Sequence, residues 1–184
     1  MEGAKGSYLQ FLKGDDDAIT EVIKEYRDGL ILYLRSYTHS EWESEEICEE
    51  VFLKLILKKP HFKGESSFKT WLWRIAGNLA LDRKRKSRRD EFFSIEEAEN
   101  TPSEEDIFLE YLKTEQKKAL HSAMKKLSED HYRVLLLVYF ENFTNSETAA
   151  IMKKSKRQVE NLLYRAKCSL KKQLEKEGFI YEEL

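Results

Sequence analysis

The residues best suited to chemistry lie in the segment 153–165, where cationic side chains alternate with amides. The amides of Gln158 and Asn161 can each donate and accept hydrogen bonds toward adenine, and arginine can pair with guanine or with phosphate. This combination indicates nucleic-acid contact, although a Lys-rich helix face is more often simply solvated. The candidate base and phosphate contacts are Lys154, Lys156, Arg157, Gln158, Asn161 and Arg165.

Two capping motifs predict the elements that position this segment. Thr144 is followed three residues later by Glu147, and Ser155 by Gln158, which is the capping-box pattern at helix N-termini. A helix of barely two turns, a brief turn and a longer helix make a helix-turn-helix, whose second helix enters the major groove of DNA. The predicted buried face of this second helix contains Val159, Leu163, Ala166, Leu170 and Leu174.

A second set of candidate residues lies on the helix predicted over residues 67–85. Asn78 and Asp82 are four residues apart and share a face, where Asp82 could accept a hydrogen bond from a base amine. Trp71 is in phase with the apolar stripe and is interpreted as a packing residue, whereas Trp73 is off the stripe and is expected to be exposed. The apolar stripe is made of Phe68, Trp71, Leu72, Ile75, Ala76 and Leu79.

The rest of the pattern also predicts helices, and no strand alternation competes with them. The composition agrees, because 41% of the 184 residues are apolar, 36% are charged and only two are proline. Two small domains with a linker fit this length best. The remaining predicted helices span residues 15–37, from about Ser44 to before Pro60, 107–127 and 128–140, the last fully buried around residues 135–140.

Several classes of function are disfavoured. The four histidines are scattered, no Gly-rich phosphate loop is present, and Cys48 and Cys168 form neither a disulfide framework nor a zinc motif. We therefore expect no catalysis, no cofactor and no metal. The longest apolar run, residues 134–140, is too short to cross a bilayer, and the start of the chain has no secretory pattern, which predicts a cytoplasmic protein.

Charge is distributed unevenly, although 32 basic and 34 acidic residues nearly cancel. Residues 83–89 form a dense basic run, and residues 91–110 carry only acidic charges. A basic patch therefore adjoins an acidic linker, which is suited to a flexible tether that does not stick to DNA.

Residues 68–85, FKTWLWRIAGNLALDRKR, closely resemble the signature of extracytoplasmic-function (ECF) sigma factors of the sigma-70 family. Residues 44–52 resemble the preceding helix of that family, and residues 159–170 resemble its promoter-reading helix. The resemblance implies an all-α fold of two small helical domains joined by a flexible acidic linker. The implied domains are sigma region 2 over residues 7–90, the linker over 91–111 and sigma region 4 over 112–176.

The same resemblance implies an alternative sigma factor that binds core RNA polymerase, recognises the −35 and −10 promoter elements and initiates transcription. Its first domain would dock on the clamp helices of the large polymerase subunit. Carboxylates crowded on one and a half turns repel one another, which suits an exposed patch that awaits a basic partner. The implied docking residues are Glu45, Glu46, Glu49, Glu50 and Phe52.

The first domain would also help to melt the downstream element and hold a flipped base in the loop over residues 61–67. The family further implies an anti-sigma factor, commonly a membrane protein, which could hold this chain at the inner face of the membrane. The implied downstream DNA contacts are Phe62, Lys63, Arg74, Asn78, Asp82, Arg83, Lys84, Arg85 and Arg88.

The main alternative is a helix-turn-helix regulator that acts without joining the polymerase. It explains the C-terminal half of the chain equally well. It does not explain the basic and aromatic segment over residues 68–85, and a small-molecule sensor would more often show strands or the pattern of a ligand cavity.

Overall fold

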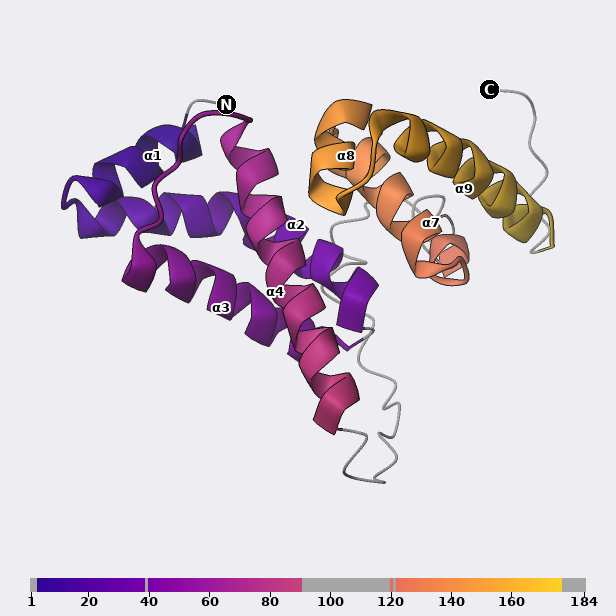
Figure 1. Ribbon diagram of the computed structural model, residues 1–184, viewed down its shortest axis with the longest axis horizontal. Coiled ribbons are helices and arrows are strands. Elements are labelled where there is room, and N and C mark those ends of the chain that lie inside the picture. Colours follow the sequence, from indigo (N-terminus) through magenta and orange to yellow (C-terminus); the bar gives the residue numbers. More distant parts are fainter. Residues whose placement is uncertain (1–2, 39, 91–119, 121, 177–184) are drawn as a thin grey trace. The chain divides into compact units, whose positions relative to one another are not determined.

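The computed structural model describes residues 3–38, 40–90, 120 and 122–176, with the side chains of residues 88–90 excepted (Figure 1). Every regular element in this described part is helical, which confirms the all-α fold. The chain divides into two compact units, Met1–Asn100 and Thr101–Leu184. Each unit has its own hydrophobic core, so each is described by itself.

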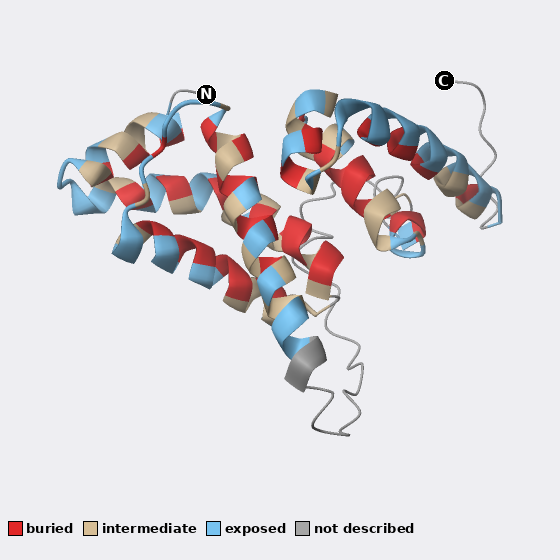
Figure 2. Ribbon diagram, viewed as in Figure 1, coloured by how far each residue is buried: buried red, intermediate tan, exposed pale blue. Residues whose placement is uncertain are grey.

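Unit 1 is a bundle of four helices in which α2 is central. Helix α2 packs against α1, α3 and α4, and α3 also packs against α4 (Figure 1). The buried residues of these helices face one another and the exposed residues lie on the outer faces, as Figure 2 shows. The elements are α1 (Gly3–Leu12), the short 3-10 helix η1 (Asp16–Ala18), α2 (Ile19–Thr38), α3 (Glu41–Lys58) and α4 (Phe68–Asp90).

Helix α1 is absent from the sequence-based expectation. Three of its apolar residues, Ala4, Tyr8 and Phe11, are buried, and the Tyr8 hydroxyl donates a hydrogen bond to the Pro60 carbonyl at 2.7 Å. A ten-residue helix that buries so few side chains shows too little periodicity to be recognised from its sequence. It nevertheless ties the N-terminus to the loop that precedes α4.

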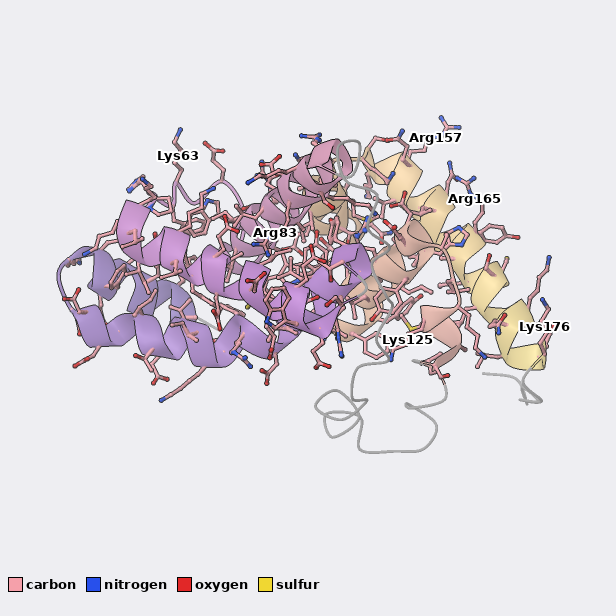
Figure 3. The ribbon with its side chains drawn as sticks, turned by 90° about the horizontal axis from the view of Figure 1, so that it is seen from below. Lys63, Arg83, Lys125, Arg157, Arg165 and Lys176 are labelled. Carbon is pink, nitrogen blue, oxygen red and sulfur yellow. The ribbon has the colours of Figure 1, made fainter. Side chains whose placement is uncertain are left out.

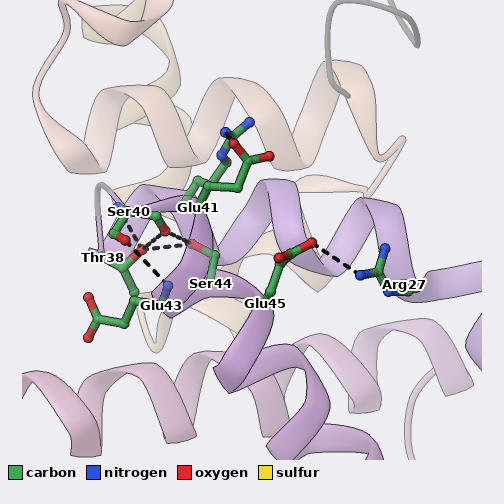
Figure 4. Close-up of polar contacts among 8 residues, drawn as sticks. Arg27, Thr38, Ser40, Glu41, Glu43, Ser44 and Glu45 are labelled. Atoms are coloured by element: carbon green, nitrogen blue, oxygen red, sulfur yellow. Dashed lines mark hydrogen bonds and ion pairs between the residues drawn. The ribbon is translucent and has the colours of Figure 1, made fainter. Parts of the chain in front are cut away.

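Helix α3 begins earlier than the sequence suggests. Its N-cap is Ser40, which has an extended backbone. The Glu43 N–H donates a hydrogen bond to Ser40 Oγ at 3.3 Å (Figure 4). Ser44 is buried one turn inside the helix, where its hydroxyl lies 2.6 Å from the Ser40 carbonyl and 2.7 Å from Thr38 Oγ1. The helix ends at Lys58, and its C-cap Lys59 has a left-handed backbone that directs the chain into Pro60.

Helix α4 buries a wider arc than its apolar stripe predicts. Trp73 is fully buried and meets Tyr26 edge-on at a centroid distance of 5.7 Å, so its predicted exposure is wrong. The reason is that α4 packs against both α2 and α3, and two neighbours cover more than one stripe. Gly77 also lies close to α2, because a Cβ atom there would stand 2.6 Å from the Tyr33 hydroxyl.

Unit 2 is smaller. Helix α9 packs against α7 and α8, and Figure 2 shows its buried residues in one stripe with exposed residues opposite. Most of the helix predicted over 107–127 lies outside the described residues, although residues 122–125 are helical. The elements are α7 (Glu129–Leu135), the π-helical turn η2 (Leu136–Phe140), α8 (Asn145–Met152) and α9 (Lys156–Lys176).

The predicted helix over 128–140 is thus divided between α7 and η2. Leu136 and Leu137 are buried as expected, but Tyr139 is 51% exposed, so complete burial up to residue 140 is wrong. An uninterrupted apolar run covers every side of a helix, and α9 and α8 can cover only part of it.

Candidate nucleic-acid and polymerase interfaces

The helix-turn-helix of unit 2 is held by both capping boxes that the sequence predicts. At α8, the Thr144 hydroxyl accepts from the Glu147 N–H at 3.2 Å, and the Glu147 carboxylate accepts from the Thr144 N–H at 3.0 Å. At α9, the Ser155 hydroxyl accepts from the Gln158 N–H at 3.2 Å, and the Gln158 side-chain oxygen accepts from the Ser155 N–H at 2.7 Å. These bonds fix where α9 starts.

The turn between α8 and α9 contains a strained residue. Lys153 has a φ of 53° and a ψ of 42°, a left-handed conformation in which glycine is the usual residue. Its N–H donates to the Ala149 carbonyl and closes α8. The tight turn brings the first residues of α9 to the surface.

Five of the six residues predicted to contact the upstream element lie exposed along α9: Lys156, Arg157, Gln158, Asn161 and Arg165. Figure 3 shows Arg157 and Arg165 extending from the helix into solvent. Neither arginine forms an ion pair with a described carboxylate, although Arg165 Nε donates a hydrogen bond to the Asn161 carbonyl at 3.4 Å. The terminal nitrogens of both guanidinium groups can therefore still bind an anionic ligand.

Gln158 and Lys154 have other bonds. The oxygen of Gln158 is occupied by the Ser155 N–H, and bidentate recognition of adenine would need that oxygen as well as the amide nitrogen. The ammonium of Lys154 lies 3.1 Å from the Asp130 carboxylate of α7, which neutralises much of its charge. Gln158 lies in the first turn of α9 and Lys154 in the turn before it, and the side chain of each already has a bonding partner.

Tyr164 is a further candidate that was not predicted from the sequence. Its side chain is 70% exposed on α9, three residues after Asn161 and next to Arg165. The signal was available, because Tyr164 is out of phase with the buried stripe that contains Val159 and Leu163. An exposed aromatic ring between an amide and an arginine is suited to stacking or apolar contact with a base.

The acidic face of α3 is only partly open. Glu45 pairs with Arg27 at 3.1 Å (Figure 4), and Glu46 pairs with Arg83 of α4 at 2.8 Å. Glu49 and Glu50 are exposed. The expected row of four mutually repelling carboxylates is therefore reduced by two internal ion pairs.

The apolar part of the docking prediction needs correction. Phe52 is 6% exposed and packs in the hydrophobic core of unit 1, because α3 turns this position toward its neighbours. The exposed apolar side chains of α3 are Trp42, Leu53 and Leu57, at 69%, 52% and 74%. They recur at steps of eleven and four residues with Glu46 and Glu49 between them, which places them on one helix face.

The predicted downstream DNA contacts differ in availability. Asn78 and Asp82 are both exposed on one face of α4, and Lys63 and Arg74 are also exposed. The Asp82 carboxylate accepts from Arg85 at 3.3 Å. Lys84 is half-buried, and Arg88 falls within α4 but its side chain lies outside the described residues.

Phe62 does not offer a stacking surface in this structure. It is 8% exposed and lies in an aromatic cluster, with its ring centroid 5.5 Å from that of Phe68 and 5.4 Å from that of Trp71. Apolar packing of the loop against α4 is the physical reason. Trp71 is half-buried in the same cluster, in line with its predicted packing role.

The two cysteines differ in their surroundings. Burial raises the pKa of the Cys48 thiol to about 12, which keeps it protonated, and Cys168 lies exposed on α9. The described residues include no cluster of His, Cys, Asp and Glu that could hold a metal ion. No described helix is both long enough and apolar enough to span a bilayer.

Comparison with known proteins identifies both units. Residues 22–90 match the family model "Sigma-70 region 2", and residues 117–170 match "Sigma-70, region 4". These matches cover α2 to α4 in unit 1 and α7, α8 and most of α9 in unit 2. The chain belongs to the sigma-70 family, as a sigma factor of the ECF type.

Related sigma factors extend the match over most of the chain. RNA polymerase sigma factor YlaC of Bacillus subtilis is 29% identical over 162 residues, which are 87% of this chain and 94% of YlaC. ECF RNA polymerase sigma factor SigW of the same organism is 28% identical over 179 residues, 90% of this chain and 93% of SigW. Helix α1 precedes the region 2 match, so the family model does not include it.

Two solved structures share the fold of this sigma factor. CnrH, solved in complex with the cytosolic domain of CnrY, is 20% identical with a TM-score of 0.64, covering 94% of this chain and 97% of CnrH. RpoE of Bartonella quintana, solved with the anti-sigma factor NepR, is 20% identical with a TM-score of 0.66, covering 86% and 98%. The two family-model matches and the related sigma factors support the sigma-factor interpretation and give no support to a regulator that acts without polymerase.

Proposed function

We propose that this ECF sigma factor docks on core RNA polymerase through the outer face of α3 and contacts promoter DNA with α4 and α9. As a sigma factor it binds the core enzyme, recognises the −35 and −10 elements and initiates transcription. The observation that carries the proposal is the outer face of α9, where Arg157, Asn161 and Arg165 lie exposed directly after a capped, tight turn. That is the geometry in which a recognition helix presents its first turns to the major groove.

The docking part of the proposal rests on the composition of one helix face. Trp42, Leu53 and Leu57 are large apolar side chains left in solvent, and Glu49 and Glu50 lie among them. Apolar anchors bordered by carboxylates favour a partner helix with an apolar ridge and basic flanks. We assign this face to the clamp helices of the large polymerase subunit.

The proposal divides the tasks between the two domains. We assign residues 7–90 to polymerase docking and to melting of the downstream element, and residues 112–176 to the upstream element. The acidic residues 91–111 would serve as the tether between them. At the upstream element, Tyr164 joins the predicted contacts.

The proposal extends to regulation and location. CnrH and RpoE were each solved with a second protein bound, and NepR, the partner of RpoE, is an anti-sigma factor. We propose that an anti-sigma factor likewise restrains this chain. Because its polymerase and DNA partners are in the bacterial cytoplasm, we place it there, acting as a transcription initiation factor without catalytic chemistry, cofactor or metal of its own.

Run-off transcription with purified core polymerase on a genomic fragment library tests the proposal. We expect start sites that appear only when the chain is added and that share two spaced elements. The proposal would be overturned if the chain binds duplex DNA tightly but adds no start site to transcription by the core enzyme. That result would favour a helix-turn-helix regulator that acts without polymerase.

A matched pair of variants tests the docking face. Leu53 and Leu57 are exposed, so replacing both by Ala should leave the fold intact while core binding, followed by native gel shift, weakens at least about tenfold. Lys54→Ala, at an exposed position on the same helix outside the apolar stripe, is the control and should bind normally. If the double variant and Lys54→Ala bind core polymerase equally well, the outer face of α3 is not the docking surface.

A further inference from the structure

One ion pair joins the proposed polymerase-docking face of α3 to the proposed DNA-contacting end of α4. Glu46 belongs to the acidic face of α3, and Arg83 belongs to the basic end of α4, 37 residues later. Their charged atoms lie 2.8 Å apart, and the two side chains are 39% and 35% exposed. A carboxylate proposed to meet polymerase thus neutralises a cation proposed to meet DNA.

Neighbouring pairs lack this property. Glu45 pairs with Arg27, which is on α2 and is not a DNA candidate. Arg85 pairs with Asp82 on its own helix, so that bond does not reach the docking face. The Glu46–Arg83 pair is placed where binding of one macromolecule can change the charge offered to the other.

We infer that the Glu46–Arg83 ion pair is an autoinhibitory contact that couples polymerase docking to the grip of region 2 on DNA. In the free protein, Glu46 competes with DNA phosphates for the Arg83 guanidinium. When a basic residue of the polymerase takes over Glu46, Arg83 is released and its guanidinium can bind phosphate in a bidentate manner. The inference rests on the proposed function, because it needs α3 to dock and α4 to hold DNA.

Thermodynamic linkage sets the size and symmetry of the effect. If docking raises the DNA affinity of region 2, DNA must raise the affinity for polymerase by the same factor. Because both side chains are more than one-third exposed, the factor should be about 2- to 5-fold, the range measured for surface ion pairs. This is enough to favour DNA binding by the assembled enzyme over the free subunit.

Binding of free, full-length protein to a fluorescein-labelled oligo(dT) strand at low salt gives the first readout, by fluorescence anisotropy. Glu46→Gln should raise the affinity about 2- to 5-fold. Glu49→Gln removes the same charge one turn away, from an exposed residue without an ion pair to the described residues, and should raise it less. When Arg83 is replaced by Gln, Glu46→Gln should raise the affinity for the strand no more than Glu49→Gln does.

Holoenzyme gives the second readout. The second assay uses core polymerase at saturating concentration on a promoter found by run-off transcription. There, Glu46→Gln should not raise the yield of heparin-resistant complex above that of the wild-type protein, because docking has already released Arg83. The inference is overturned if Glu46→Gln and Glu49→Gln act alike on the free protein, or if the gain survives without Arg83 or persists in the holoenzyme. If wild-type protein directs transcription while these tests fail, only the inference falls and the proposed function stands.

Discussion

The two units use the same kinds of charged residue but present them differently. On α4 of unit 1, Arg83 and Arg85 each lie against a carboxylate, whereas on α9 of unit 2, Arg157 and Arg165 meet none among the described residues. A cation that is already paired must exchange partners before it can bind phosphate, so its net contribution is smaller. The difference is confined to these arginines, because Lys154 and Lys156 of unit 2 also pair with carboxylates. Under the proposed function, we expect Arg157 and Arg165 to contribute more to DNA binding than Arg83 and Arg85.

The largest expected effect comes from removing the open cations. Replacing Arg157 and Arg165 together by Ala should lower the affinity of the free chain for duplex promoter DNA by more than about tenfold and reduce the salt slope by roughly 2. Replacing Arg83 and Arg85 by Ala should cost clearly less, because both are paired before binding. Fluorescence anisotropy over a series of salt concentrations measures both quantities.

Circular dichroism melting is the control for this comparison. All four arginines are at least partly exposed, so the melting temperature should change little in either double variant. Equal losses of affinity in the two double variants would contradict the difference between the units.

An intermediate effect is expected at Gln158, where a capping bond and a possible base contact meet. Gln158→Ala should lower stability by about 0.5 to 1 kcal/mol, because the Ser155 N–H loses its acceptor. Gln158→Glu keeps an acceptor and should preserve stability, but it lacks the amide donor that adenine recognition requires.

Promoter-library selection with both variants separates the two roles. If Gln158 contacts a base, both variants relax preference at one upstream position. If it only caps the helix, Gln158→Glu leaves the preference unchanged, and the open surface of α9 narrows to Arg157, Asn161, Tyr164 and Arg165.

The smallest effect concerns the turn between α8 and α9. Lys153→Gly should raise stability by about 0.5 kcal/mol, because glycine relieves the left-handed strain at a cost in unfolded-state entropy. Lys153→Ala keeps a Cβ atom and is the matched control, which should show no such gain. Urea denaturation of the two variants measures the difference, and a gain in both would mean that charge and not backbone strain is responsible.

Much of unit 2 could be predicted from the sequence, because capping boxes are local. The side chains of Thr144 and Ser155 accept hydrogen bonds from residues only three positions away. The starts of α8 and α9 can therefore be predicted from a few consecutive residues. The buried face of α9 follows from a single period in the same way. The exposed face of α9 could therefore be predicted, whereas the DNA contacts assigned to it, with Tyr164 added, stay a prediction.

Unit 1 was harder because its decisive contacts are long-range. The burial of Trp73 depends on two helices packed on either side of α4, and that of Phe62 on a loop folding back onto an aromatic cluster. The pairing of Glu46 with Arg83 joins residues that no local pattern connects. Periodicity reports one face of one helix, and so it could place these residues on α3 and α4 without showing what each would touch.

The three tryptophans of unit 1 differ in their surroundings, with Trp42 exposed at 69%, Trp71 half-buried beside the loop before α4, and Trp73 enclosed. Indole emission moves to shorter wavelength when water is excluded, so docking on α3 would alter the signal of Trp42. Occupation of the loop would alter that of Trp71, while Trp73 would report whether the bundle stays folded. If the proposed function holds, the three tryptophans are optical probes for polymerase docking, promoter melting and unfolding, and one fluorophore can be retained at a time by replacing the other two with Phe.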